Sequence, residues 1–371
     1  MTVLAKRSSD RWLRGIRGGA RVPAIAAFVL GLAASLTATA DTFQGPLEQP
    51  AQSSSLAARG PLLAIAAAGS RFVAVGQRGH IVYSDDAGNT WKQASVPVST
   101  DLVAVSFASA TKGWAVGHGG VVLHTADAGA TWTKQLDGRK SADIAVRYLE
   151  SKVGGLPSAQ KLVEREKRLA SDGGTQPLMA VHFESETTGC VAGAFNRLFC
   201  TEDGGNTWTP WMDRIDNPNE LHFYAIAGCA NGICLAGEQG MVWRFDAEKG
   251  RFVTRALPYQ GSVFGLLADG ADTLLAFGLR GSLFRSGDEG KSWERVSIGS
   301  QAGITSGAVL PGGAILLATQ AGEIVRSLDA GRTFARLKPT RPMAYYGVMS
   351  APGGKAVLVG SEGVRVEAAH D

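Results

Sequence analysis

The feature that most constrains this chain is a short motif that returns along most of its length. The first copy spans residues 72–91 and reads as two short strands joined by a glycine turn, followed by a second turn that ends in tryptophan. Alternating apolar residues mark the strands, and glycines supply the backbone angles that tight turns require. One copy could form only a hairpin, so the number and spacing of the copies decide the fold.

The second half of the motif follows the pattern Ser/Thr-x-Asp-x-Gly-x-Thr/Ser-aromatic. Its aspartates recur about every 42 residues, apart from one interval that is about 35 residues longer. They are Asp86, Asp127, Asp203, Asp246, Asp288 and Asp329, of which Asp246 lies in a degenerate copy. The strand–glycine half occurs seven times, each time after a small apolar run. We predict an all-β fold, a seven-bladed β-propeller of four-stranded antiparallel blades.

The N-terminus carries an export signal. Six basic residues precede an apolar run of about a dozen residues that ends at Ala38-Thr39-Ala40, an order typical of signal peptides. We predict that residues 1–40 are removed and that the mature chain resides in the periplasm, or in a thylakoid lumen; an uncleaved anchor is the alternative. Residues 1–40 contain six basic residues and one acidic residue, so their removal changes the net charge from +4 to −1. A near-neutral mature chain is not expected to bind nucleic acid. No later apolar run is long enough to span a membrane.

The seventh repeat stops after its third strand. We predict that residues 41–371 form a single propeller in which residues 41–60 add the missing outer strand of blade 7 and so close the ring. The proline and serine content of that segment leaves a disordered exported tail as the alternative.

Four cysteines in an exported chain indicate two disulfides. Cys229 and Cys234 flank an Asn-Gly turn, and Cys190 and Cys200 hold matching positions on the two arms of another predicted hairpin. The spacing favours Cys190–Cys200 and Cys229–Cys234 over cross-pairing, as structural crosslinks.

The long interval, residues 138–176, predicts a helical insertion between blades 2 and 3. Residues 141–153 and 157–170 read as two charged helices with a modest apolar face. They form either a charged segment lying on the surface or a lid that docks a partner.

Topology places the candidate site residues. With strands a to d ordered outward, the b–c turns and d–a connections of every blade share one face with the insertion, and the Asp turns occupy the other. Carboxylates spread around a rim cannot converge on one substrate, so we interpret the repeated aspartates as structural. The insertion face is predicted to gather Arg78, Arg197, Arg280, His118, Glu238 and Glu362 from b–c turns, with Arg214 and Arg341 from d–a connections.

These charges predict a shared anion- or protein-binding patch, against the alternative of scattered solvated side chains. Aromatic residues that begin a strands near the channel mouth are interpreted mainly as core: Phe223, Tyr224, Phe264, Tyr345 and Tyr346. Zinc-site spacings, a nucleophile elbow and phosphate-binding loops are missing from the sequence, so we expect no metal, no cofactor and no catalytic residues.

The Asp turn is the Asp box, or bacterial neuraminidase repeat, which occurs in sialidases, sortilins and some glucanases. The combined unit, VAVGxxGxIxxSxDxGxTW, resembles a narrower family, the lumenal photosystem II stability and assembly factors and their exported relatives in non-photosynthetic bacteria. The resemblance covers residues 60–365 and implies a non-enzymatic propeller that binds membrane-protein subunits through an arginine-rich patch. It implies that Arg78 and Arg280, both in G-x-R-G turns, belong to that patch; Arg197 is off the pattern.

The helical insertion, the near-neutral mature charge and the two disulfides depart from that family. We therefore expect a monomeric scaffold or assembly factor for another membrane-protein complex of the cell envelope, such as a transporter. The alternative is a sialidase-like glycoside hydrolase or a glycan-binding propeller. A sialidase needs an arginine triad and a Tyr–Glu pair, and the sequence offers no segment to which these can be assigned.

Overall fold

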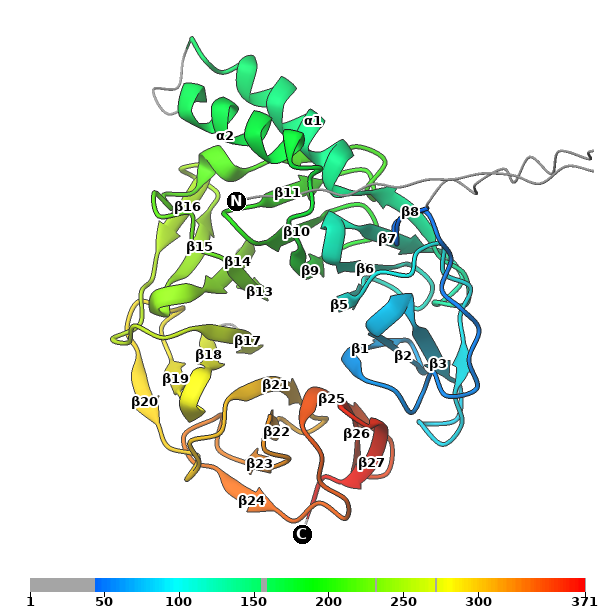
Figure 1. The fold of residues 1–371 in the computed structure, drawn as a ribbon. Coiled ribbons are helices and arrows are strands. Elements are labelled where there is room, and N and C mark those ends of the chain that lie inside the picture. Colours follow the sequence, from blue (N-terminus) through cyan, green and yellow to red (C-terminus); the bar gives the residue numbers. More distant parts are fainter. Residues whose placement is uncertain (1–43, 155–158, 231, 271, 371) are drawn as a thin grey trace, which may run out of the picture. The chain divides into compact units, whose positions relative to one another are not determined.

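Seven antiparallel sheets surround a common axis, with the first strand of each sheet nearest the centre (Figure 1). The computed structural model describes residues 44–154, 159–230, 232–270 and 272–370. The predicted signal peptide and its cleavage site lie outside these residues. The predicted seven-bladed propeller is confirmed, and six of its blades have four strands in the order a-b-c-d.

The strands follow one another outward in chain order within each blade. The strands of blades 1 and 2 are β1 (Leu62–Ala68), β2 (Arg71–Gly76), β3 (Ile81–Ser84), β4 (Lys92–Gln93), β5 (Leu102–Phe107), β6 (Gly113–Gly117), β7 (Val122–Thr125) and β8 (Thr133–Leu136). Those of blades 3 and 4 are β9 (Leu178–Phe183), β10 (Gly189–Gly193), β11 (Leu198–Thr201), β12 (Thr209–Pro210), β13 (Phe223–Cys229), β14 (Gly232–Gly237), β15 (Val242–Asp246) and β16 (Arg251–Thr254).

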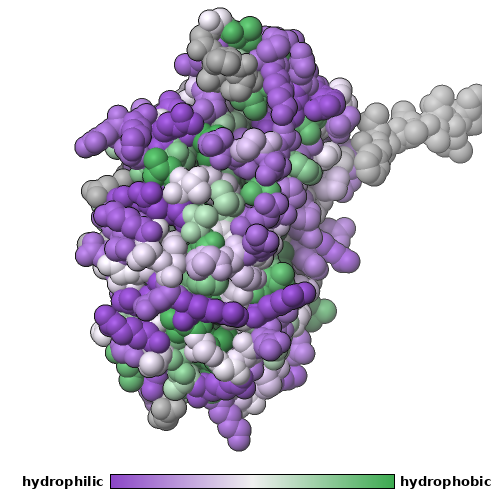
Figure 2. All heavy atoms as spheres, turned by 90° about the vertical axis from the view of Figure 1, so that its left-hand side faces the viewer, coloured by the Kyte–Doolittle hydropathy of each residue, from purple (hydrophilic) through white to green (hydrophobic). Residues whose placement is uncertain are grey.

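Blades 5 to 7 complete the ring. Their strands are β17 (Val263–Asp269), β18 (Thr273–Gly278), β19 (Leu283–Ser286), β20 (Glu294–Val296), β21 (Ile304–Val309), β22 (Ile315–Thr319), β23 (Ile324–Ser327), β24 (Ala335–Leu337), β25 (Tyr345–Ala351), β26 (Lys355–Gly360) and β27 (Gly363–Ala368). Buried apolar residues gather between neighbouring blades, while the outer wall on the side of β16 and β20 is largely hydrophilic (Figure 2).

Two helices, α1 (Gly138–Glu150) and α2 (Ala159–Ser171), lie between β8 and β9, as predicted. They pack against each other outside blade 3 (Figure 1). Asp137 caps α1 by accepting a hydrogen bond from Lys140 N at 3.1 Å. Buried Leu149 and Val163 join the same apolar cluster as residues of blades 2 and 3, so the helices extend the core. Neither helix, nor any other described helix, is long and apolar enough to cross a membrane.

Five Asp boxes share one hydrogen-bond arrangement. Asp86 Oδ1 accepts from Ser84 Oγ and from Thr90 N, each at 2.8 Å, and Asp86 Oδ2 accepts from Thr90 Oγ1 at 2.6 Å. Ser84 Oγ in turn accepts from Gly88 N at 2.9 Å. The same set recurs around Asp127, Asp203, Asp288 and Asp329. In the degenerate copy, Asp246 instead binds the backbone N and Nζ of Lys249.

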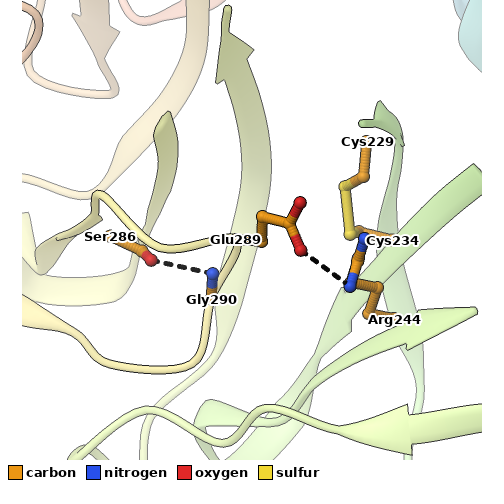
Figure 3. Close-up of a disulfide and its surroundings, with 6 residues drawn as sticks. All are labelled: Cys229, Cys234, Arg244, Ser286, Glu289 and Gly290. Atoms are coloured by element: carbon orange, nitrogen blue, oxygen red, sulfur yellow. Dashed lines mark hydrogen bonds and ion pairs between the residues drawn. A yellow bond between two sulfur atoms is a disulfide. The ribbon is translucent and has the colours of Figure 1, made fainter. Parts of the chain in front are cut away.

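Each Asp box also rests on the preceding blade. A Cβ atom on Gly129 would lie 3.0 Å from Val73 of blade 1, so the turn needs glycine for this close approach. In blade 5 the contact is ionic as well, because Glu289 reaches Arg244 of blade 4 at 3.0 Å (Figure 3). The boxes therefore hold neighbouring blades together in addition to closing their own turns.

Both disulfides have the pairing favoured by the sequence. Cys190–Cys200 joins residues directly opposite each other on β10 and β11, and Cys229–Cys234 joins β13 to β14 (Figure 3). Crosslinks between neighbouring strands close short loops and stabilise blades 3 and 4 locally.

The predicted closure of blade 7 by the N-terminal segment is wrong for the described residues 44–60. The sheet β25-β26-β27 has three strands, and residues 44–60 form no strand. Pro46 O instead accepts from Ser99 N, and Ala51 N donates to Val96 O, so this part of the segment follows the outside of blade 1. Near its end, Ala58 O accepts from Val364 N of β27 at 3.3 Å, so the segment contacts blade 7 without adding a strand. Blades 7 and 1 meet through apolar side chains.

Removing a buried box hydroxyl should destabilise the propeller. We expect Ser286→Ala to lower the free energy of unfolding by about 1–3 kcal/mol, because the buried N–H of Gly290 loses its acceptor at 2.7 Å (Figure 3). Urea unfolding of the mature chain measures the change. The control is Ser55→Ala in an exposed turn, for which a change within about 0.5 kcal/mol is expected. Equal effects of the two substitutions would contradict the structural role of the box.

The boxes also predict a loss of stability in acid. Hydrogen bonds from the side chain and backbone of Thr90, and from Ser84, lower the pKa of Asp86 to about 2; Ser292 and Ser286 do the same for Asp288. A lowered pKa in the folded state gives stability that is complete above the ordinary carboxyl pKa and disappears as the pH falls through the folded value. Between about pH 4 and pH 2, the unfolding free energy should fall less steeply in Asp86→Asn/Asp288→Asn than in the unchanged chain. Parallel pH profiles would contradict this assignment.

Candidate protein-binding face

The b–c turns of blades 1, 2, 4 and 5 share one backbone conformation. Their third residue has a positive φ, as in Arg78 (57°), Gly119 (69°), Gln239 (56°) and Arg280 (58°), and we call this position the apex. The residue after each apex is a glycine, also with positive φ. A Cβ atom on Gly79 would collide with the carbonyl oxygen of Val98, so the sequence pattern G-x-x-G is required by the space available.

Arg78 and Arg280 are exposed at the apexes of blades 1 and 5. Asp101 Oδ1 accepts from Arg78 N at 2.8 Å, which fixes the turn and leaves the guanidinium outside. Arg280 lines an open hollow of about 660 Å³ together with Arg295. His118 is exposed one residue before the apex of blade 2. The turns of blades 1 and 5 therefore present guanidinium groups on a fixed backbone.

The expectation that Arg197 is part of an exposed patch is wrong. Its side chain is 1% exposed, with Nη1 at 2.8 Å from Glu166 of α2 and Nη2 donating to Ser141 of α1 at 2.9 Å. Blade 3 replaces G-x-R-G with Gly193-Ala194-Phe195-Asn196, so the apex is Phe195, and Arg197 lies two residues later. The missing second glycine of the G-x-R-G pattern is the sequence feature that indicates a different position for Arg197.

A buried charge cluster holds the insertion on the propeller. Arg165 Nη2 lies 2.8 Å from Glu166 Oε1, and Arg165 Nη1 lies 3.5 Å from Glu220, in the connection between blades 3 and 4. Burial lowers the pKa of Arg197, and the ion pair with Glu166 opposes that shift. Such a cluster fixes geometry because removing one member leaves an uncompensated buried charge.

The two arginines of the d–a connections lie in different surroundings. Arg341 is exposed, and its Nη2 is 3.9 Å from Glu362 of the blade 7 b–c turn. Arg214 stacks on Trp211 at 4.3 Å and lines a cleft shared with Asp203 of an Asp box. Arg214 therefore contributes to a different hollow from the one lined by Arg280.

The cleft beside Arg214 lies between blades 3 and 4 and has a volume of about 540 Å³. Blade 4 has the degenerate box, in which Gly250 meets no atom of another blade within 4 Å. The lining includes His182, whose pKa is lowered by burial, but Arg214 is its single arginine and no described tyrosine lines it. No group of three or more potential metal ligands occurs among the described residues.

Sequence reasoning placed Tyr224, Phe264 and Tyr346 near the channel mouth but missed that they belong to a ring of equivalent positions. In every blade the pairing of strands a and b shifts at the start of strand a, which leaves the second residue of that strand out of the ladder. These bulges place seven half-buried residues at equivalent positions: Leu63, Val103, Met179, Tyr224, Phe264, Thr305 and Tyr346. Phe223 and Tyr345 are buried in the core, as interpreted, whereas Tyr224, Phe264 and Tyr346 are not fully buried.

Fold and repeats together define an Asp-box β-propeller. The family model described as Photosynthesis system II assembly factor YCF48 matches residues 62–142, which cover blades 1 and 2 and the start of α1. The predicted resemblance to photosystem II assembly factors is thereby confirmed. No curated protein sequence matches the chain.

Solved structures agree on the fold. YCF48 bound to D1 peptide is 17% identical, with a TM-score of 0.60, over 89% of this chain and 99% of that chain. YCF48 from Cyanidioschyzon merolae is 15% identical, with a TM-score of 0.60, over 86% and 98%. The WD40 β-propeller domain of Doa1 is 10% identical, with a TM-score of 0.62, over 89% and 99%. Identities this low show the fold alone.

The charge cluster predicts that the insertion opens when Glu166 is neutralised. We expect Glu166→Gln to lower the free energy of unfolding by about 3 kcal/mol, because buried Arg197 loses its counter-charge and buried Arg165 keeps only Glu220, at 3.5 Å. Hydrogen exchange of α1 and α2 should accelerate. The control is Glu164→Gln, two residues earlier on the exposed side of α2, which contacts Gln160. Unchanged exchange in Glu166→Gln would contradict the anchoring role.

Proposed function

We propose that the chain is an exported, non-catalytic scaffold that binds a subunit of a membrane-protein complex in the cell envelope. The observation that carries the proposal is the pair of exposed arginines, Arg78 and Arg280, at equivalent apexes of a rigid propeller. Guanidinium groups held on a fixed backbone suit carboxylates of a protein partner. One YCF48 structure contains a D1 peptide, which supports a polypeptide as the partner.

The two disulfides support an oxidising compartment, in agreement with the signal peptide that the sequence predicts at residues 1–40. The described clefts support a binding role over glycoside hydrolysis. Hydrolysis of sialidase type needs three arginines around one pocket, whereas the cleft between blades 3 and 4 is lined by Arg214 alone among arginines. We propose no cofactor, no nucleic acid and a monomeric chain.

Charge reversal at the apexes should abolish partner binding. We expect the tagged mature chain to recover one membrane complex from solubilised envelopes, and we expect Arg78→Glu/Arg280→Glu to recover less than about a tenth as much. Quantitative mass spectrometry of the purified material measures the recovery.

The matched control reverses two charges on the Asp-box rim, Lys291→Glu/Arg332→Glu, both exposed. This variant has the same change in net charge and should recover the complex normally. Equal recovery by all three proteins would overturn the arginine-face assignment. Cleavage of a sialoside by the unchanged chain would instead favour the hydrolase alternative.

A further inference from the structure

The apex of blade 3 carries an exposed aromatic residue in a strained backbone. Phe195 is 42% exposed and has a φ of 55°, although bulky side chains rarely adopt the left-handed region. It occupies the position that holds Arg78 in blade 1 and Arg280 in blade 5. Strain of this kind persists only where surrounding contacts enforce it, and it is concentrated at functional sites.

Buried contacts enforce the strain. The side chain of Asn196 is buried, and its Oδ1 accepts from Asn217 Nδ2 at 3.0 Å. Asn217 is itself tied to Leu221 by two hydrogen bonds, and Arg197 is bound to Glu166 on the other side of the turn. The turn cannot relax without breaking these buried interactions. Phe195 is therefore held outward by the fold.

Phe195 is the first member of a continuous line of rings. Its ring lies 4.6 Å from that of His222, which lies 6.3 Å from Tyr224, and Tyr224 lies 5.8 Å from Phe264. We call these four residues the aromatic track. It runs from the blade 3 apex to two of the residues at the channel mouth, and its members are exposed or half-buried. Aromatic side chains are enriched at the energetic centres of protein interfaces.

The far end of the track adjoins the cationic apex of blade 5. Leu279, which precedes Arg280 and is 37% exposed, donates its N–H to Ser262 O at 3.0 Å, beside the strand that carries Phe264. The nearby carboxylate of Glu238 already accepts a hydrogen bond from His222 N at 2.9 Å. The contact between Leu279 and Ser262 therefore links the end of the track to the turn that carries Arg280, and Arg280 lines a separate hollow with Arg295.

We propose that the aromatic track binds an extended segment of the protein partner that carries apolar side chains and carboxylates. The rings take the apolar side chains, and Arg280 with Arg295 takes the carboxylates. This inference rests on the proposed scaffold function and specifies the chemistry of its partner. It makes Phe195, rather than Arg197, the contact residue of blade 3.

The test uses the mature chain and short fluorescein-labelled synthetic peptides of glutamate, glycine and serine with two phenylalanines. Fluorescence anisotropy measures binding of this peptide, of its Phe→Ala form and of its Glu→Gln form. We expect the Phe-containing acidic peptide to bind, and we expect about tenfold weaker binding when either the phenylalanines or the glutamates are replaced.

The protein variants are Phe195→Gly and Leu328→Gly. Both remove an exposed apolar side chain, and Leu328 lies in an Asp box. Phe195→Gly should weaken binding about tenfold and leave the urea midpoint equal or higher, because glycine relieves the left-handed strain. Leu328→Gly should bind as the unchanged chain does.

Normal binding by Phe195→Gly, equal binding of the Phe→Ala peptide, or no binding of any peptide would each overturn the inference. None of these results alters the recovery of a complex from envelopes, so the scaffold proposal stands or falls separately. Loss of peptide binding in both Phe195→Gly and Leu328→Gly would also overturn the inference about the aromatic track, because the effect would not be specific to the track.

Discussion

The docking of each Asp box onto the preceding blade is the interaction on which the propeller depends. One carboxylate collects hydrogen bonds from a hydroxyl two residues before it and from the N–H and hydroxyl four residues after it, as around Asp86. This fixes a tight turn whose glycine can approach the neighbouring blade closely. Two junctions depart from this arrangement. Blade 4 has a degenerate box and an open cleft against blade 3, and blade 7, which has no Asp box, meets blade 6 through apolar side chains such as Leu337 and Val348.

The turns on the two faces of the propeller constrain the sequence in different ways. In five of the Asp boxes, the Ser/Thr, Asp, Gly and Thr/Ser positions of the motif are fixed by one set of hydrogen bonds, whereas the positions between them differ. The b–c turns on the other face constrain only the backbone, through the apex and the glycine after it. The residue at the apex therefore differs from blade to blade. In blades 1 to 5 it is Arg78, Gly119, Phe195, Gln239 and Arg280. A fixed frame with variable apexes is suited to recognition of an irregular partner surface.

Local patterns explain what the sequence could predict. Blades, Asp boxes, hairpin disulfides and the two helices each follow from residues close together in the chain. The errors concern contacts between distant segments. Burial of Arg197 depends on Glu166, which lies in the insertion, and the path of residues 44–60 depends on acceptors in blade 1. The bulges that expose Tyr224 and Phe264 depend on strand register, which apolar alternation alone does not determine.

The same reasoning explains the helical insertion. In blade 3 the glycine after the apex is replaced by Asn196, so two consecutive side-chain-bearing residues, Phe195 and Asn196, have positive φ. Such a turn is costly and needs support from outside the hairpin. α1 and α2 provide it, because Ser141 and Glu166 bind the arginine that follows the turn. The insertion lies immediately before blade 3 in the chain, which is the one blade among the first five whose b–c turn lacks the second glycine. The buried side of the insertion therefore supports this turn through Arg197, next to the contact between Asn196 and Asn217.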